Sequence, residues 1–157
     1  MRFVELIGVP FANKGRDKKT GLDCYDLVKE VYKEYGKQIP EYDDQYKSYT
    51  DMEKINELIQ NYTKSYPWKK LDKPKVPCLI AMRFGSPEGV VNHTAVYIGE
   101  GRFIHARERI GVCIDRIDNP AWERVIVGYY EYIGGGLRGR GADLQGYQAE
   151  RERCQRL

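Results

Sequence analysis

Apolar side chains recur at helical spacing early in the chain. The clearest stripe has five members: Leu27, Val28, Val31, Tyr32 and Tyr35. Their spacing places all of them on one face of a helix. Asp23 can cap the first turn, Gly36 suits the position after the last turn, and Pro40 prevents continuation. We therefore predict an amphipathic helix over 23–35 that buries this stripe.

A second stripe with the same spacing follows. Its members are Met52, Ile55, Leu58, Ile59 and Tyr62. They predict a helix over 50–62 with a buried face. Thr50 and Glu53 have the spacing of a capping box at its start. A proline-rich, extended connection around Trp68 comes next.

From residue 78 onward the helical spacing gives way to short apolar runs. The runs span 78–84, 91–99, 102–106, 111–117 and 124–133, with glycine, proline and asparagine between them. Such runs are typical of strands, and Gly99-Glu100-Gly101 suits a tight turn between the second and the third. Helices followed by strands predict an α+β domain. The N-terminal helices would pack on one face of a five- to six-stranded antiparallel sheet.

The length of 157 residues suits one domain and is short for two. The last segment differs in character, because Gly134, Gly135 and Gly136 begin a stretch rich in glycine and arginine with few apolar anchors. We therefore expect a domain over 1–133 and a tail over 134–157 that is flexible or docks on a partner.

Charge and hydropathy narrow the possible functions. A net charge of +3, with acidic and basic residues interspersed, is too small to indicate nucleic-acid binding. No apolar run is long enough to insert in a membrane. The N-terminal segment carries Glu5 in its apolar stretch and lacks a small-residue cleavage site, so a signal peptide is not predicted. We expect a protein that is made in a cytoplasm.

The candidate chemistry centres on one cysteine and the only two histidines in the chain. Cys24 lies at the predicted helix start, where unpaired N–H groups and the positive end of the helix dipole favour a thiolate. His93 and His105 lie on the two arms of the predicted hairpin, so that both imidazoles can lie at the same end of it. A thiol beside two imidazoles indicates a nucleophile, its base and an orienting group.

Other interpretations of these residues stay open at this point. A cysteine at a helix start can be a small buried apolar residue, and a lone histidine is often an ordinary core or surface residue. Cys24, His93 and His105 could also bind zinc, although the sequence suggests no fourth ligand. The four cysteines form no CxxC pair and no zinc-ribbon spacing, which fits a reduced protein. We expect no metal and no cofactor.

Two segments together resemble a known family. Gly-Leu-Asp-Cys over 21–24 and the His-to-Ala stretch over 93–106 are similar to the NlpC-type cysteine peptidases. These are papain-like enzymes that cut peptide stems of bacterial cell walls. The opening over 8–24 and the ending over 122–130 resemble the phage-associated branch of that family. The resemblance covers roughly residues 8–133.

The resemblance implies a papain-like fold and a role for each catalytic residue. Cys24 would be the nucleophile, and His93 the general base that later protonates the leaving amine. His105 would orient His93. Backbone N–H groups at the helix start, including that of Cys24, would stabilise the oxyanion.

The same resemblance implies three substrate contacts. Asp23 would hold a substrate amine as well as cap the helix. Tyr25 fits the phage branch, since the bacterial enzymes commonly have serine there. Phe11 stands where many relatives carry a tyrosine hydroxyl near the reacting carbonyl, so we expect the contacts there to differ.

The implied activity is hydrolysis of an amide bond in peptidoglycan stem peptides, the D-γ-glutamyl-diaminopimelate bond, through a thioester. The phage branch further implies a virion tail component, delivered to the cell wall, with tail-tip or hub proteins as partners. A structural tail-tip or hub protein with weak or no catalysis is the alternative. A third possibility is acyl transfer from lipids, whose enzymes usually have a membrane anchor or an apolar face near the site; the sequence shows neither.

Overall fold

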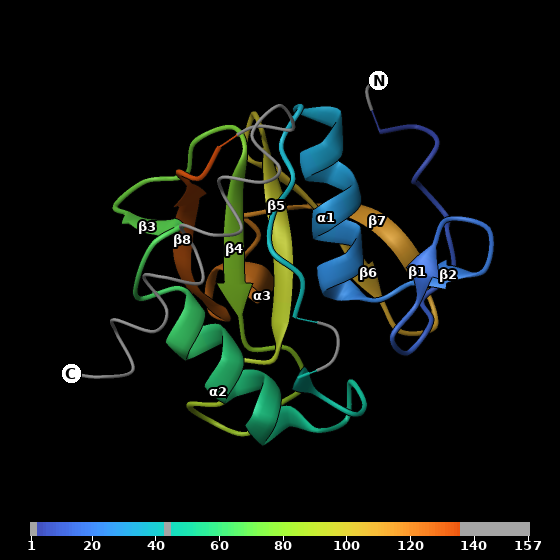
Figure 1. Cartoon of the computed structure of the whole chain (residues 1–157), viewed down its shortest axis with the longest axis horizontal. Coiled ribbons are helices and arrows are strands. Elements are labelled where there is room, and N and C mark those ends of the chain that lie inside the picture. The colour runs from blue at the N-terminus through green and yellow to red at the C-terminus, as the bar shows by residue number, and fades with distance from the viewer. Residues whose placement is uncertain (1–2, 43–44, 136–157) are drawn as a thin grey trace.

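A six-stranded antiparallel sheet forms the centre of this computed structural model, which describes residues 3–42 and 45–135. The strand order is β3-β8-β4-β5-β6-β7 (Figure 1). The strands span Trp68–Leu71 (β3), Cys78–Met82 (β4), His93–Gly99 (β5), Arg102–Arg107 (β6), Gly111–Arg116 (β7) and Ile126–Tyr132 (β8). The predicted α+β class and the number of strands are confirmed.

The chain does not follow the sheet as a simple succession of neighbours. β4 to β7 lie side by side in chain order, as predicted, but β8 returns to the interior of the sheet and pairs with both β3 and β4. The return runs through a short helix, α3 (Pro120–Glu123), which the sequence analysis did not predict. β3, predicted only as an extended connection, is a strand because β8 pairs with it along its whole length.

Helix α1 (Cys24–Glu34) confirms the first predicted helix and covers one face of the sheet (Figure 1). Asp23 is its N-cap, because the Asp23 Oδ1 accepts the Asp26 N–H at 2.8 Å. Four members of the predicted stripe are buried: Leu27, Val28, Val31 and Tyr32. They belong to the same core cluster as apolar side chains of β5 and β6. This packing fixes Cys24, the first helical residue, against the sheet.

Helix α2 (Met52–Tyr62) begins later than predicted and does not bury its apolar stripe. Asp51, and not Thr50, is the N-cap, and it makes no side-chain bond to the helix, so the capping-box prediction is wrong. The stripe faces a cleft, because α2 lies beyond the end of the sheet and not flat against it (Figure 1). The Asn56 Oδ1 anchors the helix by accepting the Val91 N–H at 2.9 Å.

The segment before α1 carries Phe11 to the same cleft. A small hairpin of β1 (Arg16–Asp17) and β2 (Gly21–Leu22) leads into the helix, and Phe11 forms a β-bridge with Leu22. The segment is also tied to β7. Gly111 has a φ of +88°, and a Cβ on it would lie 2.5 Å from the Val9 carbonyl oxygen, so only glycine fits this approach.

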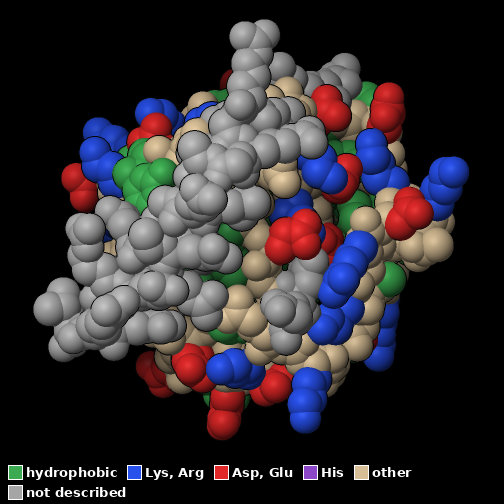
Figure 2. All heavy atoms as spheres, in the orientation of Figure 1, with side chains coloured by type: hydrophobic (Ala, Val, Ile, Leu, Met, Phe, Trp, Pro, Cys, Tyr) green, Lys and Arg blue, Asp and Glu red, His purple; other side chains and the backbone are tan. Residues whose placement is uncertain are grey.

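The surface and the tail add little to this picture. Acidic and basic side chains are interspersed on the face that Figure 2 shows. Within the described residues, no helix is long and apolar enough to cross a membrane. Residues 136–157 of the expected tail lie outside the described residues, so the division into a domain over 1–133 and a tail stays a prediction.

Candidate active site

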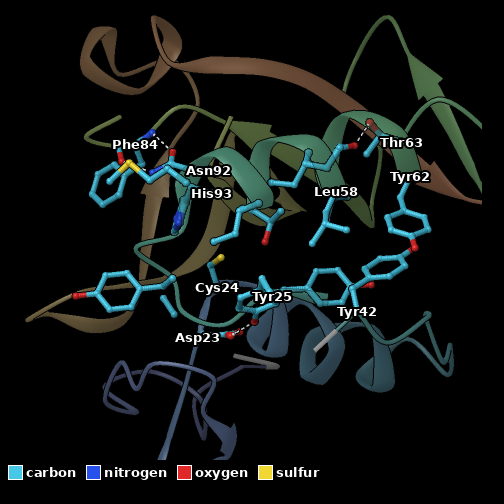
Figure 3. Close-up of a pocket in the computed structure, with 18 of the residues that line it drawn as sticks. Asp23, Cys24, Tyr25, Tyr42, Leu58, Tyr62, Thr63, Phe84, Asn92 and His93 are labelled. Atoms are coloured by element: carbon cyan, nitrogen blue, oxygen red, sulfur yellow. Dashed lines mark hydrogen bonds between the residues drawn. The ribbon is translucent and has the colours of Figure 1, made fainter. Parts of the chain in front are cut away.

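A cleft of about 250 Å³ opens between the start of α1, helix α2 and the sheet. Five of the six site residues predicted from the sequence line it: Phe11, Asp23, Cys24, Tyr25 and His93. Figure 3 shows the Cys24 sulfur and the His93 ring directed toward each other across this space. The structure therefore brings together a helix start and a strand start that are far apart in the sequence.

The surroundings of the Cys24 thiol differ from the sequence-based expectation of a thiolate. Burial of the site, followed by the negative charge of Asp23, raises the pKa of Cys24 to about 12. Hydrogen bonds with the side chain and backbone of Thr94 on β5, and with the backbone of Tyr25, lower this pKa. Their effect is smaller than that of burial and Asp23. The expected thiolate is thus corrected to a protonated thiol, since desolvation outweighs the favourable helix end.

The two histidines meet as the hairpin pattern predicts. The His93 Nε2 lies 2.9 Å from the His105 Nδ1. His93 is the first residue of β5 and reaches the cleft from the end of the strand. The ring of His105 is fully buried on the face of the sheet opposite α1, where it packs against Phe103 and Trp122. His105 therefore reaches the cleft through His93.

Both imidazoles are neutral at pH 7. Burial, and then the charges of His105 and Arg107, lower the pKa of His93 well below 6.5. Burial also lowers the pKa of His105 to about 4, although Asp115 partly offsets the effect. Together with the protonated Cys24, the resting site is a neutral thiol beside a neutral imidazole and not an ion pair.

Asp115 extends the row of hydrogen-bonded groups, and the sequence analysis missed it. Its Oδ2 lies 2.8 Å from the His105 Nε2. The same oxygen lies 3.7 Å from the Cys113 sulfur and 3.9 Å from an Arg107 guanidinium nitrogen. Strand alternation puts Asp115 on the face of Cys113, which pairs with His105 across β6 and β7. That register, however, is not readable from the sequence.

The potential metal ligands that lie close together differ from the three residues, Cys24, His93 and His105, that the sequence suggested. Within the described residues, the group of potential metal ligands whose atoms lie within 4.8 Å of one another comprises His105, Cys113 and Asp115. Cys24 and His93 are not in it. The hydrogen bond between His105 and Asp115 accounts for this group, and the cation of Arg107 close to the carboxylate disfavours a metal ion there.

A second missed residue, Tyr46, holds Asp23 in place. The Tyr46 hydroxyl donates a hydrogen bond to the Asp23 Oδ2, while the other oxygen caps α1. Burial, and then the charge of Asp23, raise the pKa of Tyr46, so the hydroxyl stays a donor. Tyr46 lies in the connection before α2, and no periodic pattern there signals its role. Asp23 is itself buried, so its charge acts on the cleft with little screening by water.

The remaining predicted residues form the walls of the cleft. The Phe11 ring packs edge-on against Tyr49, with ring centroids 5.1 Å apart. The Tyr25 hydroxyl donates to the Pro40 carbonyl oxygen at 2.6 Å, which directs its polar end away from Cys24. Phe11 supplies no hydroxyl to the cleft. The tyrosine hydroxyl that contacts Asp23 is that of Tyr46.

Several solved structures are similar to this fold. An NlpC/P60 family protein from Bacillus cereus ATCC 10987 is 22% identical, with a TM-score of 0.58 over 82% of this chain and 37% of its own. A protein described as similar to lipoprotein, of the NLP/P60 family, from Staphylococcus aureus subsp. aureus Mu50 is 20% identical, with a TM-score of 0.58 over 85% and 40%. The chain thus spans less than half the length of these two proteins.

A third structure is nearly the same length as the matched region. The NlpC/p60 domain of the peptidoglycan hydrolase SagA is 21% identical, with a TM-score of 0.51 over 83% of this chain and 92% of that domain. These likenesses confirm the predicted papain-like α+β fold. A comparison with curated protein sequences gave no match. The sequence profile of the NlpC/P60 family matches residues 8–131, most of the chain, and the chain therefore belongs to the NlpC/P60 family.

Proposed function

We propose that this protein is a cysteine endopeptidase that hydrolyses amide bonds in peptidoglycan stem peptides. The observation that carries the proposal is the cleft in which the Cys24 thiol faces His93, itself hydrogen-bonded to His105 at 2.9 Å (Figure 3). Membership of the NlpC/P60 family supports this activity, since its members are typically cysteine peptidases. The structural likeness to a domain of a peptidoglycan hydrolase supports it as well.

In the proposed reaction, Cys24 attacks the carbonyl carbon of the amide. Because the thiol rests protonated, its proton passes to His93 as the sulfur–carbon bond forms. N–H groups at the start of α1 stabilise the negatively charged carbonyl oxygen. The carbon–nitrogen bond then breaks, and the leaving amine takes the proton from His93. A water molecule hydrolyses the resulting thioester, which releases the carboxylic acid and restores the thiol.

The hydrogen bonds behind His93 determine which of its nitrogens can act as the base. If the His105 Nε2–H donates to Asp115, the His105 Nδ1 is an acceptor. The His93 Nε2 must then carry its proton to donate to it, which leaves the His93 Nδ1 unprotonated. We therefore assign His105 and Asp115 as positioning residues that keep His93 in the tautomer able to accept the thiol proton.

The finer parts of the function rest on resemblance. They are cleavage of the D-γ-glutamyl-diaminopimelate bond and a place in a phage tail, beside tail-tip or hub proteins. In that setting the virion would carry the protein to the cell wall. A structural tail component with little catalysis stays the alternative, and activity of the isolated chain on purified peptidoglycan separates the two.

Digestion of purified peptidoglycan tests the proposal. Wild-type protein should release muropeptides whose masses identify the cleaved bond, and Cys24→Ala should release none while keeping its melting temperature. Cys78→Ala, which removes a buried thiol outside the cleft, is the matched control and should stay active. Equal release by the wild type and Cys24→Ala would remove Cys24 from the mechanism, and release by neither would favour the structural alternative.

A further inference from the structure

The cleft has a polar end and an apolar end. Cys24, His93, Asp23 and Asn92 lie toward one end, and Leu58, Tyr42 and Tyr62 lie toward the other (Figure 3). The apolar end is formed by one face of α2 together with ring and aliphatic side chains of α1, the connection between α1 and α2, β3 and β4. These residues are Tyr25, Tyr42, Met52, Ile55, Leu58, Ile59, Tyr62, Trp68 and Leu79.

The aromatic side chains of this end turn their polar atoms into the protein. The Tyr25 hydroxyl donates to the Pro40 carbonyl at 2.6 Å, and the Tyr62 hydroxyl donates to the Gln45 Oε1 at 2.7 Å. The Trp68 Nε1–H donates to the Tyr42 hydroxyl at 3.3 Å. With these groups engaged, the wall that faces the cleft is built largely of carbon. Such a wall binds apolar groups and offers little to a hydrated polar chain.

The core covers the apolar face of α2 only in part, through contacts with Ile59. None of the side chains of α2 is buried, although its stripe is as apolar as that of α1. Leaving such a stripe in contact with water is unfavourable, and a continuous apolar patch of this kind often marks a binding site. The stripe lies in the same cleft as the proposed nucleophile, so a molecule held beside Cys24 can cover it.

The charges of the cleft restrict this group further. Its charged lining residues are Asp23 and Glu108, and none of the described residues that line it is lysine or arginine. A carboxylate or phosphate placed there would meet acidic side chains and no cation. The cleft therefore favours an uncharged group over an anionic one.

We propose that the substrate carries an uncharged apolar group, aliphatic or aromatic, beside the bond that Cys24 attacks, and that this group binds along α2 between Leu58, Tyr42 and Trp68. The proposal rests on the proposed function in that it takes Cys24 to be the nucleophile. The polar stem peptide alone does not provide such an apolar group. The apolar wall beside Cys24 is also the kind of surface that acyl transfer from lipids would use, and the sequence did not reveal it.

Alkylation of Cys24 by a series of N-alkylmaleimides tests this subsite without any peptidase assay. The thiol adds across the maleimide double bond, a sulfur–carbon bond forms, and the neighbouring carbon takes the proton. The rate at Cys24 is followed by mass spectrometry of its peptide and divided by the rate for glutathione. From N-ethyl to N-heptyl, this ratio should rise by at least about tenfold, since each fully buried methylene is worth a factor of about four.

Two variants and one control locate the effect. Leu58→Asn and, separately, Ile55→Asn should each lower the chain-length dependence at least about threefold, because each places an amide in the apolar wall. Val127→Asn, on an exposed position of β8 outside the cleft, should leave it unchanged. The subsite is overturned if the wild-type rate ratio does not rise with chain length, or if it rises as much in both variants as in the wild type.

The maleimide experiment and the peptidoglycan digestion can fail independently of each other. If chain-length dependence is found but peptidoglycan is not digested, the subsite stands and the wall substrate is wrong. If peptidoglycan is digested by Cys24 but chain length has no effect, the proposed function stands and the subsite is wrong.

Discussion

Cys24, His93 and His105 rest in their uncharged forms. The pKa of Cys24 is raised to about 12 and that of His105 is lowered to about 4, chiefly by burial in both cases. Many activated cysteines instead sit in electropositive surroundings that lower the thiol pKa. Here Asp23 adds a negative charge beside the thiol. Proton transfer to His93 would therefore accompany attack on the substrate and not precede it.

Asp115 provides a sharp test of how His93 is held. Asp115→Ala should lower kcat on the order of 10- to 100-fold with little change in KM, because the His105 tautomer is no longer fixed. Asp118→Ala is the matched control, since it removes an exposed carboxylate from the same part of the chain. Nitrogen chemical shifts should show a His105 Nε2–H form in the wild type. The same tautomer in Asp115→Ala would contradict the positioning role.

The two histidines should differ in importance. His93→Ala should reduce kcat/KM more than His105→Ala, because the first removes the base and the second only its partner. Both side chains are buried, so the melting temperature of each variant is measured alongside its rate. A larger loss in His105→Ala at equal folded fraction would mean that the roles are exchanged.

Among the elements, α1 and α2 play different parts. α1 is fixed by four buried apolar side chains and carries Cys24. α2 has no buried side chain and is joined to the strand side of the cleft by the bond from the Val91 N–H to Asn56. Elements with few buried contacts open at lower free energy than the core. α2 is thus the wall of the cleft that moves most easily.

Hydrogen exchange of an Asn56 variant tests this difference. Asn56→Ala should increase amide exchange in α2 by several-fold, because it removes a hydrogen bond worth about 1 kcal/mol and leaves the Val91 N–H without this acceptor. Exchange in α1 should not change. Glu57→Ala, an exposed neighbour on the same helix, serves as control. If Asn56→Ala and Glu57→Ala give the same exchange rates, the Asn56 anchor is unimportant.

The buried histidines should make the stability of the whole molecule depend on pH. Their folded-state pKa values lie below 6.5, so the unfolded chain binds more protons than the folded one as the pH falls. Stability is therefore full above about pH 6.5 and is lost toward pH 4, by about 1.4 kcal/mol per pH unit for each histidine.

Thermal unfolding between pH 7 and pH 4.5 measures this effect. The wild-type melting temperature should fall over this range, and the fall should be smaller in a His93→Gln, His105→Gln double variant. His105 faces Asp115 and Arg107 as well as His93, and the Asp115 carboxylate raises the pKa of His105. An Asp115→Asn variant should therefore lower that pKa further, and the melting temperature should fall more steeply with decreasing pH. An identical pH dependence in the wild type and the double variant would assign the acid sensitivity to other groups.

The sequence by itself determined the elements whose signals are local. The stripe of α1 with its Asp23 cap, the apolar runs of β4 to β7 and the Gly99-Glu100-Gly101 turn are set by neighbours a few residues apart. The pairing of His93 with His105 followed from the same hairpin. Motifs around Cys24 and these histidines were enough to indicate the family.

Tertiary structure decided what depends on contacts between distant segments. β8 lies between β3 and β4, which no local pattern specifies. The stripe of α2 reads like that of α1, yet it lines a cleft, because a stripe encodes an apolar face and not what covers it. Asp115 joins the site through strand register, and Tyr46 through a loop. The raised pKa of Cys24 likewise arises from burial, which only the folded chain creates.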